Sequence, residues 1–170
     1  MNMNQTNDES HNAAYERTGF WGKRAAGCIV YATSTNQFLI AQRSQSVLAP
    51  NTWGTWGGAI DQDEEPEDAA LRELYEEGAN LDQPLVDVIP SYVFKHSSGF
   101  EYHNFIVVVE HEFEPELTEE TQEYMWTTLD NLPANLNSGL KEFLFSPEAQ
   151  QQLATLDAQE QKAKIKGPRM

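Results

Sequence analysis

The segment from Gly58 to Gly78 constrains the fold and function of this chain more than any other, and it reads GAIDQDEEPEDAALRELYEEG. Pro66 suits the first position of a helix, because its missing N–H would have no helical partner there. The following run, 67–77, is rich in Ala, Leu, Arg and Glu, which favour helix. The spacing predicts a helix whose buried stripe consists of Ala70, Leu71, Leu74 and Tyr75.

The opposite face of this predicted helix carries Glu73, Glu76 and Glu77 at positions i, i+3 and i+4. Like charges at these spacings repel, and they lie near the helix C-terminus, where the macrodipole disfavours anions. One interpretation is a solvated acidic surface. The other is a functional site whose bound Mg²⁺ compensates the repulsion, since Mg²⁺ prefers oxygen ligands.

The wider spacing of charged residues favours the second interpretation. Gly58 is followed after five residues by Glu64, and Glu64 after seven residues by the run Arg72-Glu73-Leu74-x-Glu76-Glu77. This pattern resembles the Nudix box of the Nudix hydrolase (MutT-like) family. The resemblance is less complete at the end, because Ala79 and Asn80 stand where the family has Gly and an apolar residue.

The displaced glycine, Gly78, predicts that the helix ends in a left-handed cap one residue earlier than in the family pattern. Trp56 also stands where the family commonly has Pro. Every acidic position of the box is present, so we expect these departures to alter the helix exit rather than the chemistry.

The resemblance implies an α+β fold, the Nudix-type α/β/α sandwich with a mixed β-sheet, over about residues 20–145. It also implies an enzyme that hydrolyses a nucleoside diphosphate linked to another moiety X, with Mg²⁺ or Mn²⁺. The metal would neutralise the diphosphate and promote the attack of water on phosphorus. Its expected ligands are the Gly57 carbonyl together with Glu73, Glu76, Glu77 and Glu120.

Other roles follow from the same resemblance. Glu120 lies in an acidic loop before the strand that holds Trp126, with Glu119 and Glu123 as alternatives, and a plain acidic loop is an equal interpretation. We expect Glu73 or Glu120 to be the general base, and Arg72 to orient carboxylates through an ion pair with Glu64. Arg43 would bind substrate phosphate, although a surface salt bridge explains it equally well.

Composition limits the remaining possibilities. The chain has 170 residues, enough for one domain with a single core, and a net charge of −16. Its pI near 4.4 argues against a partner of duplex nucleic acid. No apolar stretch is long enough to span a membrane and no signal peptide is visible, so we expect a cytoplasmic protein. We expect Cys28, Trp53 and Trp56 to lie in the core, and no zinc site among the histidines.

The patterns divide the chain into a disordered leader (1–18), a Nudix domain (19–147) with Phe20 and Trp21 as its first anchors, and a C-terminal helix with a basic tail (148–170). Strands are predicted at 25–33, 37–42, 53–58, 85–94, 102–110 and 124–126. Further helices are predicted at 138–145 and 146–163.

The residues do not identify the substrate. The absence of subfamily markers favours a (d)NTP pyrophosphatase that releases nucleoside monophosphate. The alternatives are an ADP-ribose or nucleotide-sugar pyrophosphatase and, in another class, a non-catalytic nucleotide-binding Nudix module. We expect a monomer or homodimer.

Overall fold

The computed structural model describes residues 24–45, 49–79 and 81–166. The predicted leader, the anchors Phe20 and Trp21, and the end of the basic tail lie outside these residues. None of the helices in the described part of the chain is long and apolar enough to cross a membrane.

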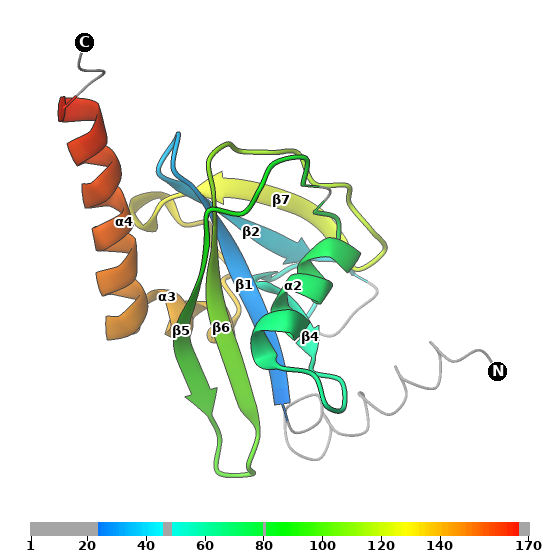
Figure 1. Cartoon of the computed structure of the whole chain (residues 1–170). Helices are drawn as coiled ribbons and strands as arrows, with labels where there is room; N and C mark the ends of the chain where they lie inside the picture. Colours follow the sequence, from blue (N-terminus) through cyan, green and yellow to red (C-terminus); the bar gives the residue numbers. More distant parts are fainter. Residues whose placement is uncertain (1–23, 46–48, 80, 167–170) are drawn as a thin grey trace.

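The described chain forms one sheet and three α-helices (Figure 1). The strands are β1 (Arg24–Ala32), β2 (Gln37–Arg43), β3 (Trp53–Gly54), β4 (Trp56–Ala59), β5 (Asp87–Lys95), β6 (Glu101–Val109) and β7 (Thr121–Thr127). The helices are α2 (Pro66–Glu76), the short 3-10 helix η1 (Leu129–Asn131), α3 (Ser138–Leu144) and α4 (Pro147–Lys166).

The sheet is mixed, as predicted. Its main path runs β3-β2-β1-β6-β5, with β4 paired to β1 and β7 paired to β2. The central strands β1 and β6 are parallel, and the other pairs are antiparallel. The predicted strand at 53–58 is divided at Thr55, because β3 pairs with β2 whereas β4 pairs with β1.

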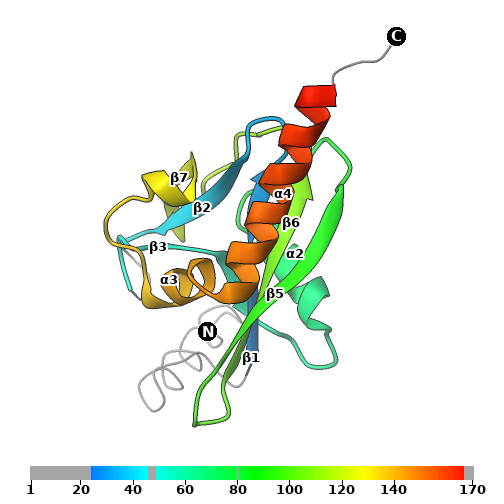
Figure 2. The ribbon, with the colours of Figure 1, turned by 90° about the vertical axis from the view of Figure 1, so that its left-hand side faces the viewer.

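Helices cover both faces of the sheet, which confirms the predicted α/β/α sandwich. Strand β1 is buried on both sides, with Cys28 and Val30 in the core under α2, and Ile29 and Tyr31 in the core under α3 and α4. Figures 1 and 2 show α2 on one side of the sheet and α3 and α4 on the other. Cys28, Trp53 and Trp56 are buried, as predicted.

Helix α2 begins at Pro66, as predicted, but one residue of its predicted buried stripe was wrong. Ala70 and Leu74 are fully buried, whereas 48% of Tyr75 is exposed. The buried face is rotated toward Glu77, which is only 9% exposed. This rotation turns Tyr75 out of the core, and it could not be predicted from apolar residues alone.

The C-terminal end of α2 confirms the predicted glycine cap. Gly78 has φ +130°, and its N–H donates to the Tyr75 carbonyl at 3.4 Å. The N–H of Ala79 donates to the Leu74 carbonyl at 3.1 Å, which completes a Schellman motif. Ala79, which stands where the family has Gly, is buried in the same core cluster as Leu74. It therefore takes part in the end of the helix through both its N–H and its side chain.

We expect Gly78→Ala to destabilise the protein by about 2 kcal/mol or more, because it combines backbone strain with a steric clash. A Cβ on Gly78 would lie 2.0 Å from the Glu116 carbonyl oxygen. Gly99 is the matched control, since its φ is +94° but a Cβ there would meet nothing within 4 Å. Urea unfolding of both variants measures the difference, and an equal loss of stability would contradict the clash.

Candidate active site

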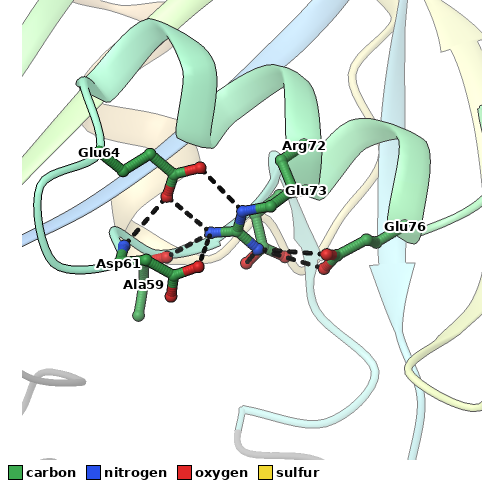
Figure 3. Close-up of polar contacts among 6 residues, drawn as sticks. All are labelled: Ala59, Asp61, Glu64, Arg72, Glu73 and Glu76. Atoms are coloured by element: carbon green, nitrogen blue, oxygen red, sulfur yellow. Dashed lines mark hydrogen bonds and ion pairs between the residues drawn. The ribbon is translucent and has the colours of Figure 1, made fainter.

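Arg72 is the centre of a polar cluster that joins α2 to the loop before it (Figure 3). Its Nε and Nη2 donate to the two carboxylate oxygens of Glu64 at 2.9 and 3.0 Å. Its Nη2 also donates to the Ala59 carbonyl at 3.1 Å and lies 3.5 Å from Asp61 Oδ2. The predicted Arg72–Glu64 ion pair is therefore present and ties the end of the loop to the helix, while the Ala59 contact ties the end of β4 to it.

The same guanidinium reaches two of the box glutamates. Arg72 Nη1 donates to Glu73 Oε1 at 3.1 Å and to Glu76 Oε2 at 3.2 Å. The hydrogen bonds to Glu64 hold the pKa of Arg72 above its usual range, and they lower the pKa of Glu64. Arg72 thus hydrogen-bonds to Glu64, Glu73 and Glu76 at once, which is the arrangement that a role in orienting these carboxylates requires.

Glu73 lies directly against the Gly58 backbone. A Cβ on Gly58 would come within 2.6 Å of Glu73 Oε1, so a side chain at this position would displace the carboxylate. Burial raises the pKa of Glu73 to about 7, and repulsion from Glu76 and Glu120 adds to the effect, while Arg72 opposes it. The carboxylate is therefore held at a position where its negative charge is poorly compensated.

Glu77 is the most buried carboxylate of the cluster. Its pKa is raised well above the usual range by burial, and further by the charges of Glu73 and Glu120. Arg43 and a hydrogen bond from the Gly57 backbone lower it in part. The Gly57–Gly58 backbone of β4 consequently contacts both glutamates, the buried Glu77 through Gly57 and the partly buried Glu73 through Gly58.

The predicted residues from outside the box lie near this cluster. Glu120 is exposed in the loop before β7, and its charge acts on both Glu73 and Glu77. The Ser44 N–H donates to the Glu120 carbonyl at 2.9 Å, which ties this loop to the end of β2 beside Arg43. Glu76 lies at the rim of the cluster, with 57% of its side chain exposed.

The donor set fits a hard divalent cation, although it is not assembled around one. Among the described residues, no three His, Cys, Asp or Glu side chains already converge in a geometry that holds a metal ion. The buried carboxylate of Glu77 and the partly buried carboxylate of Glu73 nevertheless repel each other beside the Gly57–Gly58 backbone. Removing such charges from water is costly without a compensating partner. Oxygen ligands of this kind are those that Mg²⁺ and Mn²⁺ prefer.

Sequence reasoning missed two contributors to the site. The sequence assigned no role to Asp61, because its approach to Arg72 depends on how the loop folds. Tyr102 lies far along the chain, yet its hydroxyl contacts the backbone region of Gly57. No local sequence signal marks such a long-range contact.

Comparisons with known proteins show the family to which the chain belongs. The family model described as NUDIX domain matches residues 22–146. Dihydroneopterin triphosphate diphosphatase of Haemophilus influenzae is 28% identical over 139 residues, which cover 69% of this chain and 85% of that protein. A nucleoside triphosphate pyrophosphatase/Nudix hydrolase fusion protein of Bifidobacterium longum is 30% identical over 123 residues, 66% of this chain but only 25% of the fusion.

The crystal structure of RenU, a Nudix hydrolase from M. smegmatis, has the same fold. Its TM-score is 0.59 at 23% identity, and the match covers 82% of this chain and 89% of that one. The predicted family is confirmed, since the family model spans most of the sequence. The chain belongs to the Nudix family, and it is a Nudix pyrophosphohydrolase.

Proposed function

We propose that this protein hydrolyses a nucleoside triphosphate, or a closely similar heterocyclic triphosphate, to the monophosphate and pyrophosphate with Mg²⁺ or Mn²⁺. The observation that carries the proposal is the placement of the buried Glu77 and the partly buried Glu73 against the Gly57–Gly58 backbone. Such a pair is unfavourable by itself and becomes favourable when a cation and its phosphate ligands enter.

The residues that would hold the metal are Glu73, Glu77 and the Gly57 carbonyl, with Glu76 and Glu120 joining from the rim. A bound divalent cation would neutralise phosphate charge and lower the pKa of the attacking water. Because Glu73 and Glu77 are fixed by β4 and Arg72, little side-chain ordering would be needed when the metal binds.

Other side chains would bind and orient the substrate. Arg43 already acts on Glu77 electrostatically, so its charge is close enough to attract phosphate into the site. We assign the general base to Glu73 or Glu120, because both are carboxylates of this cluster and a base must reach the attacking water. Arg72 is engaged with Glu64, Glu73 and Glu76, which favours a role in positioning rather than in substrate contact.

The triphosphate class has independent support. The name of the Haemophilus influenzae relative is dihydroneopterin triphosphate diphosphatase, so its named substrate is a triphosphate. The alignment with this relative covers most of both chains. A triphosphate of a nucleoside or a pterin combines a flat heterocycle with the same phosphate chain. The proposed site recognises the phosphate chain, which is common to both.

The test is a substrate panel with the purified protein in Mg²⁺ and in Mn²⁺. The panel holds canonical and oxidised nucleoside triphosphates, dihydroneopterin triphosphate, ADP-ribose, nucleotide sugars and diadenosine polyphosphates, with products separated by chromatography. We expect a triphosphate to give monophosphate and pyrophosphate, and we expect EDTA to abolish turnover because it removes the metal.

Two outcomes would overturn the triphosphate proposal. AMP and a sugar phosphate as the only products would assign the enzyme to ADP-ribose or nucleotide sugars. Turnover that persists in excess EDTA, after removal of bound metal on a chelating column, would contradict the metal-dependent mechanism.

A further inference from the structure

Tyr102 lies on the side of the sheet that faces away from α2. It precedes Ile106 by four residues on β6, so both side chains point to the same face of the strand. Ile106 belongs to the core beneath α3 and α4. Tyr102 therefore approaches β4 from the side opposite Glu73 and Glu77.

The phenol end of Tyr102 fills the space above two glycines. A Cβ on Gly27 would lie 2.2 Å from Tyr102 Oη, and a Cβ on Gly57 would lie 2.4 Å from the same oxygen. Gly27 and Gly57 are direct partners in the β1–β4 pairing. Both strands thus lack side chains at the one place where this hydroxyl enters.

The hydroxyl also has a specific partner. Tyr102 Oη and Thr55 Oγ1 are 2.7 Å apart and share a hydrogen bond. Thr55 is the residue between β3 and β4, where the chain leaves its pairing with β2 and begins its pairing with β1. The hydrogen bond therefore fixes the point at which the strand changes partners, two residues before Gly57.

We propose that Tyr102, through its hydrogen bond to Thr55, is a positioning residue that holds the Gly57–Gly58 backbone against Glu73 and Glu77. The backbone of β4 is enclosed between the phenol on one face and the two carboxylates on the other. Loss of the hydroxyl would let the Thr55–Gly58 segment shift away from both carboxylates. The kinetic consequence rests on the proposed function, whereas the effect on the backbone does not.

Tyr31 provides a matched control. Its hydroxyl also forms internal hydrogen bonds, with Asp157 and with Asn36, and its side chain is 1% exposed. Tyr31 lies in the core beneath α3 and α4, and its hydroxyl is tied to α4 rather than to β4. Tyr31→Phe therefore removes two internal hydrogen bonds of a tyrosine hydroxyl without touching the Gly57–Gly58 segment.

The experiment compares Tyr102→Phe, Thr55→Val, Thr55→Ser and Tyr31→Phe in the full chain. Amide hydrogen exchange of Gly57 and Gly58 is followed by NMR, together with Tm, kcat and KM on the best triphosphate. We expect Tyr102→Phe and Thr55→Val each to speed exchange of these two amides and to lower kcat by about three- to tenfold with KM nearly unchanged, the effect of one lost hydrogen bond.

Thr55→Ser keeps the hydroxyl and should retain wild-type exchange and kcat. Tyr31→Phe should lower Tm without changing the amide exchange of Gly57 and Gly58 or kcat. The double variant Tyr102→Phe/Thr55→Val should show no faster amide exchange and no lower kcat than the stronger single variant, because the two substitutions remove the same hydrogen bond.

The proposal is overturned if Tyr102→Phe changes exchange at Gly57 and Gly58 no more than Tyr31→Phe does. A failure of the proposed function gives a different result, since the wild-type protein itself would then lack triphosphate turnover. The exchange measurement would still decide the role of Tyr102 in that case.

Discussion

Replacing Glu77 with Gln is expected to lower kcat by about 10²–10³-fold, because a metal ion contributes several kcal/mol of transition-state stabilisation. The substitution preserves side-chain volume and can still accept the hydrogen bond from the Gly57 backbone. Burial raises the pKa of Glu77, so the neutral amide is no less compatible with its surroundings than the carboxylate. The Tm of the metal-free variant should therefore equal or exceed that of the metal-free wild type.

Glu67→Gln is the control for this prediction. Glu67 lies in the first turn of the same helix, and its side chain is exposed. Glu67→Gln makes the same change in charge outside the carboxylate cluster, so the kcat of this variant should stay at the wild-type value. Wild-type turnover by Glu77→Gln, measured with saturating Mg²⁺, would exclude Glu77 from the metal site.

Replacing Arg72 with Ala is expected to reduce both activity and stability. The variant loses two hydrogen bonds to Glu64 and leaves Glu73 and Glu76 without their shared cation. Residues that orient metal ligands typically contribute 10–100-fold, so we expect about that loss in kcat or in metal affinity. Loss of the Glu64 and Ala59 contacts should also lower the free energy of unfolding by about 1–3 kcal/mol.

Arg72→Lys separates charge from geometry. Lysine keeps the positive charge but cannot form the two parallel hydrogen bonds that Glu64 accepts from Nε and Nη2. We expect most of the loss in kcat to persist in Arg72→Lys. Arg24→Ala is the control, and it should leave kcat and stability unchanged because Arg24 is exposed at the start of β1. Full recovery of kcat by lysine would show that charge alone is needed. Titration calorimetry with Mn²⁺ would locate the loss in metal affinity or in turnover.

The box could be predicted from sequence because its residues lie close together along one helix and the loop before it. Their roles depend on the i, i+3 and i+4 geometry, which is a property of any α-helix. The Arg72–Glu64 pair was instead implied by the family resemblance, because Glu64 precedes α2 and is not part of the helix. The Gly78 cap was predicted from the tolerance of glycine for positive φ. The sandwich was expected from the family resemblance, and the burial of β1 on both faces agrees with it.

Features that depend on the packing of distant elements could not be predicted. Tyr75 was wrongly placed in the core, because two glutamates take the buried face of α2 and apolar spacing does not reveal this. The break at Thr55 and its hydrogen bond to Tyr102 arise only when β4 joins β1. Glu120 was favoured by its spacing from Trp126, but its proximity to Glu73 and Glu77 emerges from the pairing of β7 with β2.

We propose that the partly buried Glu73 and the buried Glu77 together form a site for a divalent cation. The most direct measurement is an EPR titration of free Mn²⁺ against the wild-type protein, Glu77→Gln and Glu67→Gln. We predict saturable binding by the wild type and by Glu67→Gln, and at least about tenfold weaker binding by Glu77→Gln. Equal Mn²⁺ affinity in all three proteins would contradict the claim.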